Sequence, residues 1–230
     1  METPQNTPAE ETKPKKSSYE TIEESIAKMR LTFDNATLPG IFEILLTVGY
    51  TEERINLLKN DLTHLEDLQQ IQTKEYADQY AETELFNNKK KEIDIEYTIH
   101  RGLVNILFKG NTHARSVLKL DEPKPRTYAN WYQQVSNFYD QLGGIADLQT
   151  KASTVGVTEA KVTTQKQAIV DLQGIKESQR IEISEAQAAT EARDIAFDEL
   201  FPQYTEYLEY AKILLAGNQV LEALGVTVKR

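Results

Sequence analysis

The residues that could do acid–base or metal chemistry in this chain are its three histidines and its many carboxylates. Asp61 precedes His64 by three positions and Glu96 precedes His100 by four, so each pair would share one face of a helix. A di-metal site in a helical bundle requires two Glu-x-x-His pairs together with further inward glutamates, and the sequence contains no such pair. We therefore interpret these histidines, together with His113, as ordinary surface or interhelix residues, and we predict no metal site.

Other catalytic signatures are missing as well. The chain has no cysteine, so it has neither a thiolate nucleophile nor a thiolate metal ligand. It also contains no glycine-rich phosphate loop, no Gly-x-Ser-x-Gly and no His-Glu-x-x-His. Neighbouring carboxylates on helices this rich in glutamate favour a solvated acidic face over an acid–base pair. The sequence thus predicts a non-enzymatic protein with no catalytic residues and no cofactor.

Composition narrows the range of partners. The chain has 26 basic and 36 acidic side chains and a formal net charge of −10, which opposes nucleic-acid binding because that binding depends on neutralising phosphates. No apolar run approaches the roughly 18 residues typical of a membrane span, and the N-terminus lacks the layout of a signal peptide. We predict a cytoplasmic protein that binds neither nucleic acid nor membrane.

Two groups of residues are candidates for contact with a protein partner. The basic cluster is either a solvated helix face, which we prefer, or a contact for an acidic partner; it comprises Lys89, Lys90 and Lys91. The aromatic group stands at helical spacing, which is more typical of a core; it comprises Tyr128, Trp131, Tyr132, Tyr204 and Tyr207. Any of these aromatic side chains that stays exposed is a candidate binding patch, because aromatic residues are enriched at the centres of interfaces.

The helices that must position these residues belong to a segment that occurs twice. Residues 48–111 align with residues 155–218 without a gap, every partner lying 107 positions further on. Eighteen of the 64 aligned positions are identical, where average residue usage would give about four. We interpret this as a tandem duplication.

The sequence of the first half predicts a tail, three helices and a short terminal helix. Residues 1–16 are rich in proline and poor in apolar residues, which predicts a disordered tail. Ser17 has capping-box spacing before a first helix, and residues 41–48 form a short apolar helix. Thr51 then caps a long helix that extends to about Lys109, roughly 85–90 Å if it is unbroken.

The second half repeats this order after a linker of prolines and charges at 121–126. Gly143-Gly144 predicts the loop between its first two helices, and residues 145–154 form the short helix. Thr158 caps the second long helix. The middle of that helix is rich in alanine, which permits close approach of a neighbouring helix but buries little area, and this predicts a two-helix stalk.

Together these patterns predict an all-α fold: an elongated helical bundle from a tandem duplication. The two long helices pack together, and short helices thickening the ends complete the bundle. The predicted domains are a tail (1–16), repeat 1 (17–120), a linker (121–126) and repeat 2 (127–230), with the two repeats sharing one core.

The stretch LFPQYTEYLEYAKILLAGNQVLEALGV, residues 200–226, resembles the C-termini of uncharacterised, entirely helical proteins from Bacteroidota. The resemblance covers about the last thirty residues and includes no catalytic motif. It implies a helical fold and no particular activity or site.

Three functions remain open at this point. The preferred one is a non-catalytic structural or adaptor protein that acts through elongated helical surfaces, with a protein partner or self-association. The alternative is a helical bundle that binds a small ligand in an aromatic pocket between the repeats, lined by Trp131, Tyr204 and Tyr207. A membrane-active protein is the third, and it lacks the apolar hairpin that insertion would need.

Overall fold

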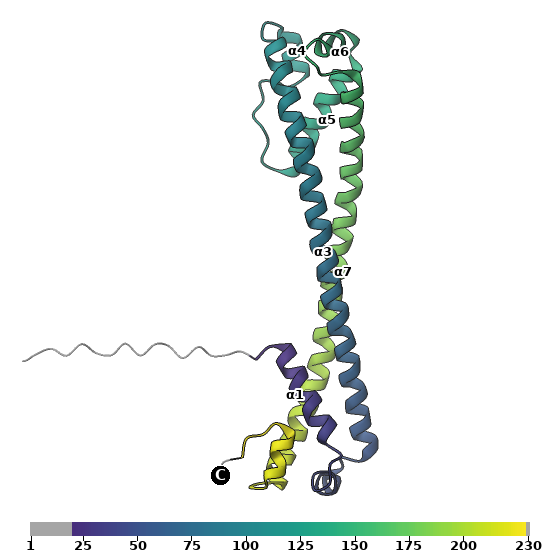
Figure 1. Ribbon diagram of the computed structural model, residues 1–230, viewed down its shortest axis with the longest axis vertical. Helices are drawn as coiled ribbons and strands as arrows, with labels where there is room; N and C mark the ends of the chain where they lie inside the picture. The colour runs from purple at the N-terminus through teal and green to yellow at the C-terminus, as the bar shows by residue number, and fades with distance from the viewer. Residues whose placement is uncertain (1–19, 229–230) are drawn as a thin grey trace, which may run out of the picture. The chain divides into compact units, whose positions relative to one another are not determined.

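A computed structural model describes residues 20–228 of the chain (Figure 1). The tail predicted at 1–16 and the cap predicted at Ser17 lie outside the described residues. Within the described range every regular element is a helix and none is a strand, which confirms the all-α prediction. Of these helices, none is both long enough and apolar enough to cross a membrane.

Two helices of 56 residues dominate the described chain, and shorter helices stand between and around them in sequence. In order, the elements are α1 (Ile22–Asn35), α2 (Phe42–Leu45), the 3₁₀ turn η1 (Leu46–Val48), α3 (Glu52–Leu107), α4 (Thr112–Val117), α5 (Tyr128–Gly144), α6 (Ala146–Ser153), α7 (Glu159–Leu214) and the 3₁₀ helix η2 (Gln219–Leu224). The packing of the two long helices against each other confirms that part of the prediction.

Local capping chemistry sets where the long helices begin. The hydroxyls of Thr51 and Thr158 accept hydrogen bonds from the backbone N–H three residues on, at 3.2 and 3.4 Å. Gly49 and Gly156 precede them with φ of 90° and 82°, a left-handed conformation that glycine adopts without strain. Both caps were predicted, and both are confirmed.

The first helix begins later than the sequence predicted. α1 starts at Ile22 behind Thr21, whose side chain and Glu24 form a reciprocal capping box. Ser17 and Thr21 both stand three residues before a glutamate, so the local pattern alone does not choose between them.

The predicted loop at Gly143-Gly144 was wrong, because both residues lie inside α5. A side-chain Cβ added to Gly143 would stand 3.1 Å from the Cγ1 of Val162 on α7. This glycine therefore allows α5 to approach α7 closely rather than ending the helix.

The chain forms two compact units, each built from both predicted repeats. Among the described residues, the first unit comprises 20–67 and 194–228, and the second comprises 68–193. Each unit contains a stretch of α3 beside a stretch of α7, and each has its own cluster of buried hydrophobic residues. The division into repeats 17–120 and 127–230 stays a prediction.

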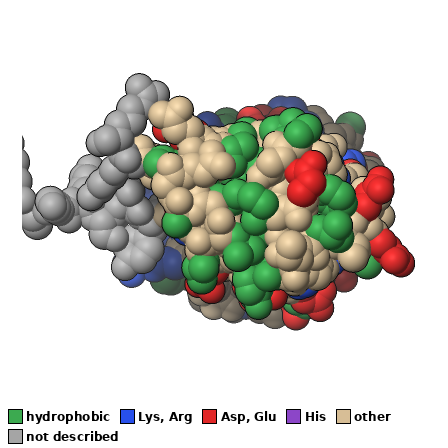
Figure 2. All heavy atoms as spheres, turned by 90° about the horizontal axis from the view of Figure 1, so that it is seen from below, with side chains coloured by type: hydrophobic (Ala, Val, Ile, Leu, Met, Phe, Trp, Pro, Cys, Tyr) green, Lys and Arg blue, Asp and Glu red, His purple; other side chains and the backbone are tan. Residues whose placement is uncertain are grey.

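In the first unit, α1 packs against the long helices and against η2. The ring of Phe33 meets those of Tyr204 and Tyr207 edge-on, both at 6.1 Å between centroids. The hydroxyl of Thr32 and the amide of Asn35 donate to backbone carbonyls at the end of η2, at 3.1 and 2.7 Å. A view from the end at which α2 lies shows hydrophobic side chains reaching the surface among polar ones (Figure 2). Such scattered exposure is normal for a folded protein.

In the second unit, α5 takes the place that α1 has in the first. The indole of Trp131 on α5 donates to Asp94 on α3 at 2.7 Å, and Asp140 on α5 pairs with Lys166 on α7 at 2.8 Å. α5 also packs on α6. Each unit thus packs one shorter amphipathic helix against a stretch of each long helix.

The two long helices run antiparallel within the second unit. Gln179 donates to Thr83 at 3.1 Å, and Arg193 donates to Gln69 at 3.4 Å. Both hydrogen bonds fit one antiparallel register of α3 and α7, in which Ala186 of α7 lies level with Tyr76 of α3. Ala186 is 1% exposed, so small side chains do line this part of the contact, as the sequence predicted.

Candidate functional site

The structure separates the predicted aromatic group into two places. Tyr128, Trp131 and Tyr132 lie on α5 in the second unit, where Trp131 is buried and its two neighbours are half-buried. Tyr204 and Tyr207 are buried in the first unit. The interpretation of these rings as core residues is confirmed for Trp131, Tyr204 and Tyr207.

The basic cluster lies at the edge of the same core. The ammonium of Lys90 stands 4.9 Å from the centroid of the Trp131 ring, a distance suited to a cation–π contact. Lys89 pairs with Glu92 at 2.8 Å, and Lys91 is exposed. Of the three lysines, Lys90 is thus the one that joins the aromatic group.

The histidine that the sequence paired with Glu96 is buried between helices. The Nδ1 of His100 shares a hydrogen bond of 2.9 Å with the Tyr139 hydroxyl, and its Nε2 lies 3.6 Å from the Glu96 carboxylate. Burial lowers the pKa of His100 below its ordinary value, because the charged imidazolium is poorly solvated there. His64 and His113 are exposed. All three fit the predicted surface or interhelix roles.

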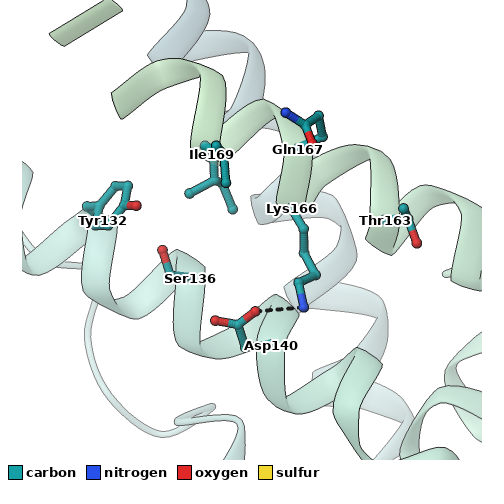
Figure 3. Close-up of a pocket in the computed structure, with 8 residues that line it drawn as sticks. Tyr132, Ser136, Asp140, Thr163, Lys166, Gln167 and Ile169 are labelled. Atoms are coloured by element: carbon teal, nitrogen blue, oxygen red, sulfur yellow. Dashed lines mark ion pairs between the residues drawn. The ribbon is translucent and has the colours of Figure 1, made fainter. Parts of the chain in front are cut away.

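A groove lies between α5 and α7 (Figure 3). It has a volume of about 470 Å³ and is lined by Tyr132, Ser136, Asp140, Thr163, Lys166, Gln167, Ile169 and Val170. The ion pair of Asp140 and Lys166 spans it, and Ser136 contributes a buried hydroxyl without a hydrogen-bond partner among the described residues. The groove therefore offers a hydroxyl, an ion pair and an apolar wall.

The serine of the groove is not arranged as an activated nucleophile among the described residues. A serine nucleophile needs a base within hydrogen-bond reach to take its proton. Among the described residues Ser136 has no such contact, and Asp140 is already held by Lys166.

Three carboxylates meet where α3 and α7 pack in the second unit. Oxygens of Glu75, Glu182 and Glu185 lie within 4.8 Å of one another, as the ligands of a hard cation would. Desolvation, followed by the nearby charges of Glu185 and Asp78, raises the pKa of Glu182. Lys74 bonds Glu75 at 3.1 Å and Asp78 at 2.7 Å, so a protein cation already offsets part of this negative charge.

An exposed apolar surface lies on α3, opposite its core side. Four large apolar side chains are exposed there within three turns: Ile95 by 50%, Ile99 by 52%, Leu103 by 37% and Ile106 by 76%. Gly102 lies among them and is exposed as well. We call these five residues the outer face of α3.

The outer face was not among the sequence-predicted sites. The same stretch of α3 buries a second set of residues, Ile93, Tyr97, His100, Val104 and Phe108, against the rest of the unit. A helix that is apolar on opposite sides is usually buried on both. That double pattern was the signal available in the sequence.

The corresponding face of α7 has a different character. Counting 107 positions on from the five residues of the outer face gives Pro202, Glu206, Glu209, Tyr210 and Ile213, all of them exposed. Glu206 forms an ion pair with Arg54 at 3.5 Å. The two faces therefore differ mainly at the centre, where α7 has Glu206 and Glu209 in place of Ile99 and Gly102.

Comparison of the chain with protein-family models, curated proteins and solved structures found no match. The resemblance of residues 200–226 to helical proteins of Bacteroidota stays a prediction.

Proposed function

We propose that the protein is a non-catalytic structural or adaptor protein that binds protein partners through its helix surfaces. The observation that supports this proposal is the outer face of α3. Contiguous exposed apolar residues on a helix that already has a buried side mark a site of protein interaction. The cytoplasmic location and the lack of nucleic-acid binding stay predictions of the sequence.

The energetics favour burial of this face by a partner. Full burial of one leucine or isoleucine contributes about 1.5–3 kcal/mol. The four side chains are between 37% and 76% exposed, so roughly half of that gain is still available at each of them. These four residues do not belong to the buried core of the described unit, because other positions of α3 form its core side.

A pull-down with the purified chain as bait tests this function. We expect the wild type to retain a defined set of proteins, counting further copies of itself, and Ile99→Glu to lose them. Ile181→Glu is the matched control, because Ile181 is 53% exposed on α7 of the same unit and stands outside the outer face. If Ile99→Glu retains the same proteins as the wild type, the outer face is not a binding surface and the proposal fails.

A second function, binding of a small ligand, is favoured by the groove between α5 and α7. Its volume of about 470 Å³ falls in the range of about 300–1,000 Å³ typical of ligand pockets. It contains Tyr132 but not the aromatic trio of Trp131, Tyr204 and Tyr207, so it is not the aromatic pocket that the sequence analysis proposed.

Thermal unfolding with a panel of small carboxylates and amides tests this second function. A ligand that binds the folded state raises Tm with its concentration. Lys166→Met, which removes the ammonium from the groove, should abolish the shift for carboxylates. A panel that leaves Tm unchanged in the wild type would argue against it.

A further inference from the structure

We propose that the outer face of α3 binds the same face of a second copy of this chain, with the two α3 helices antiparallel about a two-fold axis. The proposal rests on the proposed function, because it names the partner that this apolar surface receives.

The spacing of the exposed residues is that of a helix–helix seam. On α3, Glu92, Ile95, Ile99, Gly102 and Ile106 follow one another at steps of 3, 4, 3 and 4. Lys109, in the turn directly after the helix, stands three residues beyond Ile106. This is the a/d pattern by which one helix packs along another. All six are exposed, whereas the seam on the opposite side of α3 is already filled by the core of the second unit. The exposed seam therefore remains available to another helix.

The seam is complementary to the same seam of a second copy that runs in the opposite direction. In an antiparallel pair centred midway between His100 and Arg101, Ile95 packs against the partner's Ile106. Ile99 then meets the partner's Gly102, where nothing lies within 4 Å of the position that a Cβ would occupy. The isoleucine thus finds a space in the facing helix, as a knob enters a hole.

Charge complementarity selects the same register. At both ends of the antiparallel seam, Glu92 lies opposite the partner's Lys109. Glu92 pairs with Lys89 at 2.8 Å within its own chain, so Lys109 of the partner subunit would add a second cation to that carboxylate. In a parallel pair, Glu92 would meet another Glu92 and Lys109 another Lys109, and like charges directly opposite oppose association. The antiparallel arrangement is therefore preferred.

A two-fold arrangement makes every contact occur twice. The same patch serves both copies, as in an isologous dimer interface. Leu103 flanks the seam and adds apolar area at its edge. On α7, Glu206 and Glu209 stand at the positions that match Ile99 and Gly102, so the second long helix lacks this seam.

Sedimentation analysis of the full chain between about 1 and 100 μM tests the dimer. We expect a monomer–dimer equilibrium in the wild type and a dissociation constant raised about 100-fold or more in Ile99→Glu, because two buried isoleucines are lost per dimer. The matched control is Ile213→Glu, since Ile213 is 73% exposed at the position of α7 that matches Ile106. Circular dichroism must show that both variants keep the helicity of the wild type, so that a loss of association is not caused by unfolding.

Charge reversal tests the register. Glu92→Lys and Lys109→Glu should each weaken the dimer several-fold, and the double variant should restore it. In a parallel dimer, the single variants would associate no more weakly than the wild type, and the double variant would show no restoration.

Cysteine cross-linking gives a second measure of direction, because the chain has no cysteine of its own. Ile95→Cys combined with Ile106→Cys in one chain should form a disulfide-linked dimer on oxidation. Neither single variant should do so, since its two sulfurs would be eleven residues apart along the helices, roughly 16 Å and far beyond disulfide reach. Efficient cross-linking of Ile95→Cys alone would overturn the antiparallel arrangement.

The outcomes separate this inference from the proposed function. Two results together would overturn self-association and leave the adaptor function intact: the wild type is monomeric at 100 μM, and Ile99→Glu fails to retain host proteins that the wild type retains in the pull-down. A dimer that Ile99→Glu does not weaken would overturn the assignment of this face.

Discussion

Ala186 offers a direct test of how closely the long helices pack in the second unit. It lies on α7, level with Tyr76 of α3 by the register of the two interhelix hydrogen bonds. Its side chain is 1% exposed, whereas Ala188 two residues on is exposed. Replacing Ala186 by leucine would put three more carbon atoms into a space that has no room for them.

The expected cost follows from the neighbours of each alanine. Overpacking a filled contact typically costs about 1–3 kcal/mol, and we expect Ala186→Leu to fall in that range. Ala189 is 8% exposed and borders an open hollow between α3 and α7, so a leucine there can turn outward and should cost less. Ala188→Leu should stay within about 0.5 kcal/mol of the wild type, because it changes only a solvent-facing position.

Urea unfolding followed by tryptophan fluorescence measures these differences. Trp131 is the only tryptophan of the chain and is buried in the second unit, so its emission reports on that unit. With an m-value of about 2 kcal/mol/M, a loss of about 2 kcal/mol lowers the midpoint by about 1 M. We expect the midpoints to rise in the order Ala186→Leu, Ala189→Leu, Ala188→Leu.

The control and the refuting result are both contained in this series. Alanine and leucine have similar helix propensities, so the three variants differ mainly in what surrounds them. If Ala186→Leu and Ala188→Leu unfold at the same urea concentration, then α3 and α7 do not pack closely at this level, and the register inferred from the hydrogen bonds is wrong.

Three further predictions address other contacts. A glycine-to-alanine change inside a helix brings a gain in stability of about 0.8–1 kcal/mol, and Gly174→Ala, with open space around it, should show that gain in urea unfolding. Gly143→Ala should lack the gain, because its Cβ would press on Val162. Equal gains in the two variants would mean that the Val162 side chain moves aside. The lowered pKa of His100 means that the unfolded chain binds a proton more readily than the folded one, so its contribution to stability is complete above the unfolded value of about 6.5 and is lost as pH falls toward and through the lower folded pKa. His100→Asn should therefore flatten the fall in midpoint between pH 7.5 and 5.5, and His64→Asn, at an exposed position, should not. Burial raises the pKa of Asp94, but hydrogen bonds from Lys124 and Trp131 outweigh burial and hold that pKa below its usual value. The stability that this carboxylate contributes is therefore present above pH 3.8 and is lost as pH falls through the folded pKa. Asp94→Ala should lower the midpoint at pH 7 by more than Asp94→Asn, which keeps an acceptor for the indole; identical fluorescence and midpoints would show that the Trp131 contact contributes nothing.

The structure confirms the features that neighbouring residues determine among themselves. The caps at Thr51 and Thr158 and the left-handed glycines before them depend on residues within four positions, so the sequence could predict them. The helical class and the two long helices follow from the same local patterns. The aromatic residues on helical seams were interpreted as core, and most are.

Predictions failed where the deciding contact came from far along the chain. Gly143 was predicted to lie in a loop, yet it lies inside α5, where the lack of a Cβ leaves room for Val162 of α7. The groove beside Tyr132 depends on the approach of α5 to α7, and no local pattern announces it. The aromatic group was treated as one candidate patch, but its members lie in two separate cores.

By itself, then, the sequence determined that the chain is helical, where its two long helices begin, and that no familiar catalytic motif is present. Tertiary structure decided which of the two apolar seams of α3 is buried. In the sequence, Ile95, Ile99 and Ile106 look no different from Ile93, Tyr97 and Val104, because periodicity shows that a residue is on a face without showing what that face meets. Only the packing of α5 and α7 against one seam leaves the other exposed to solvent.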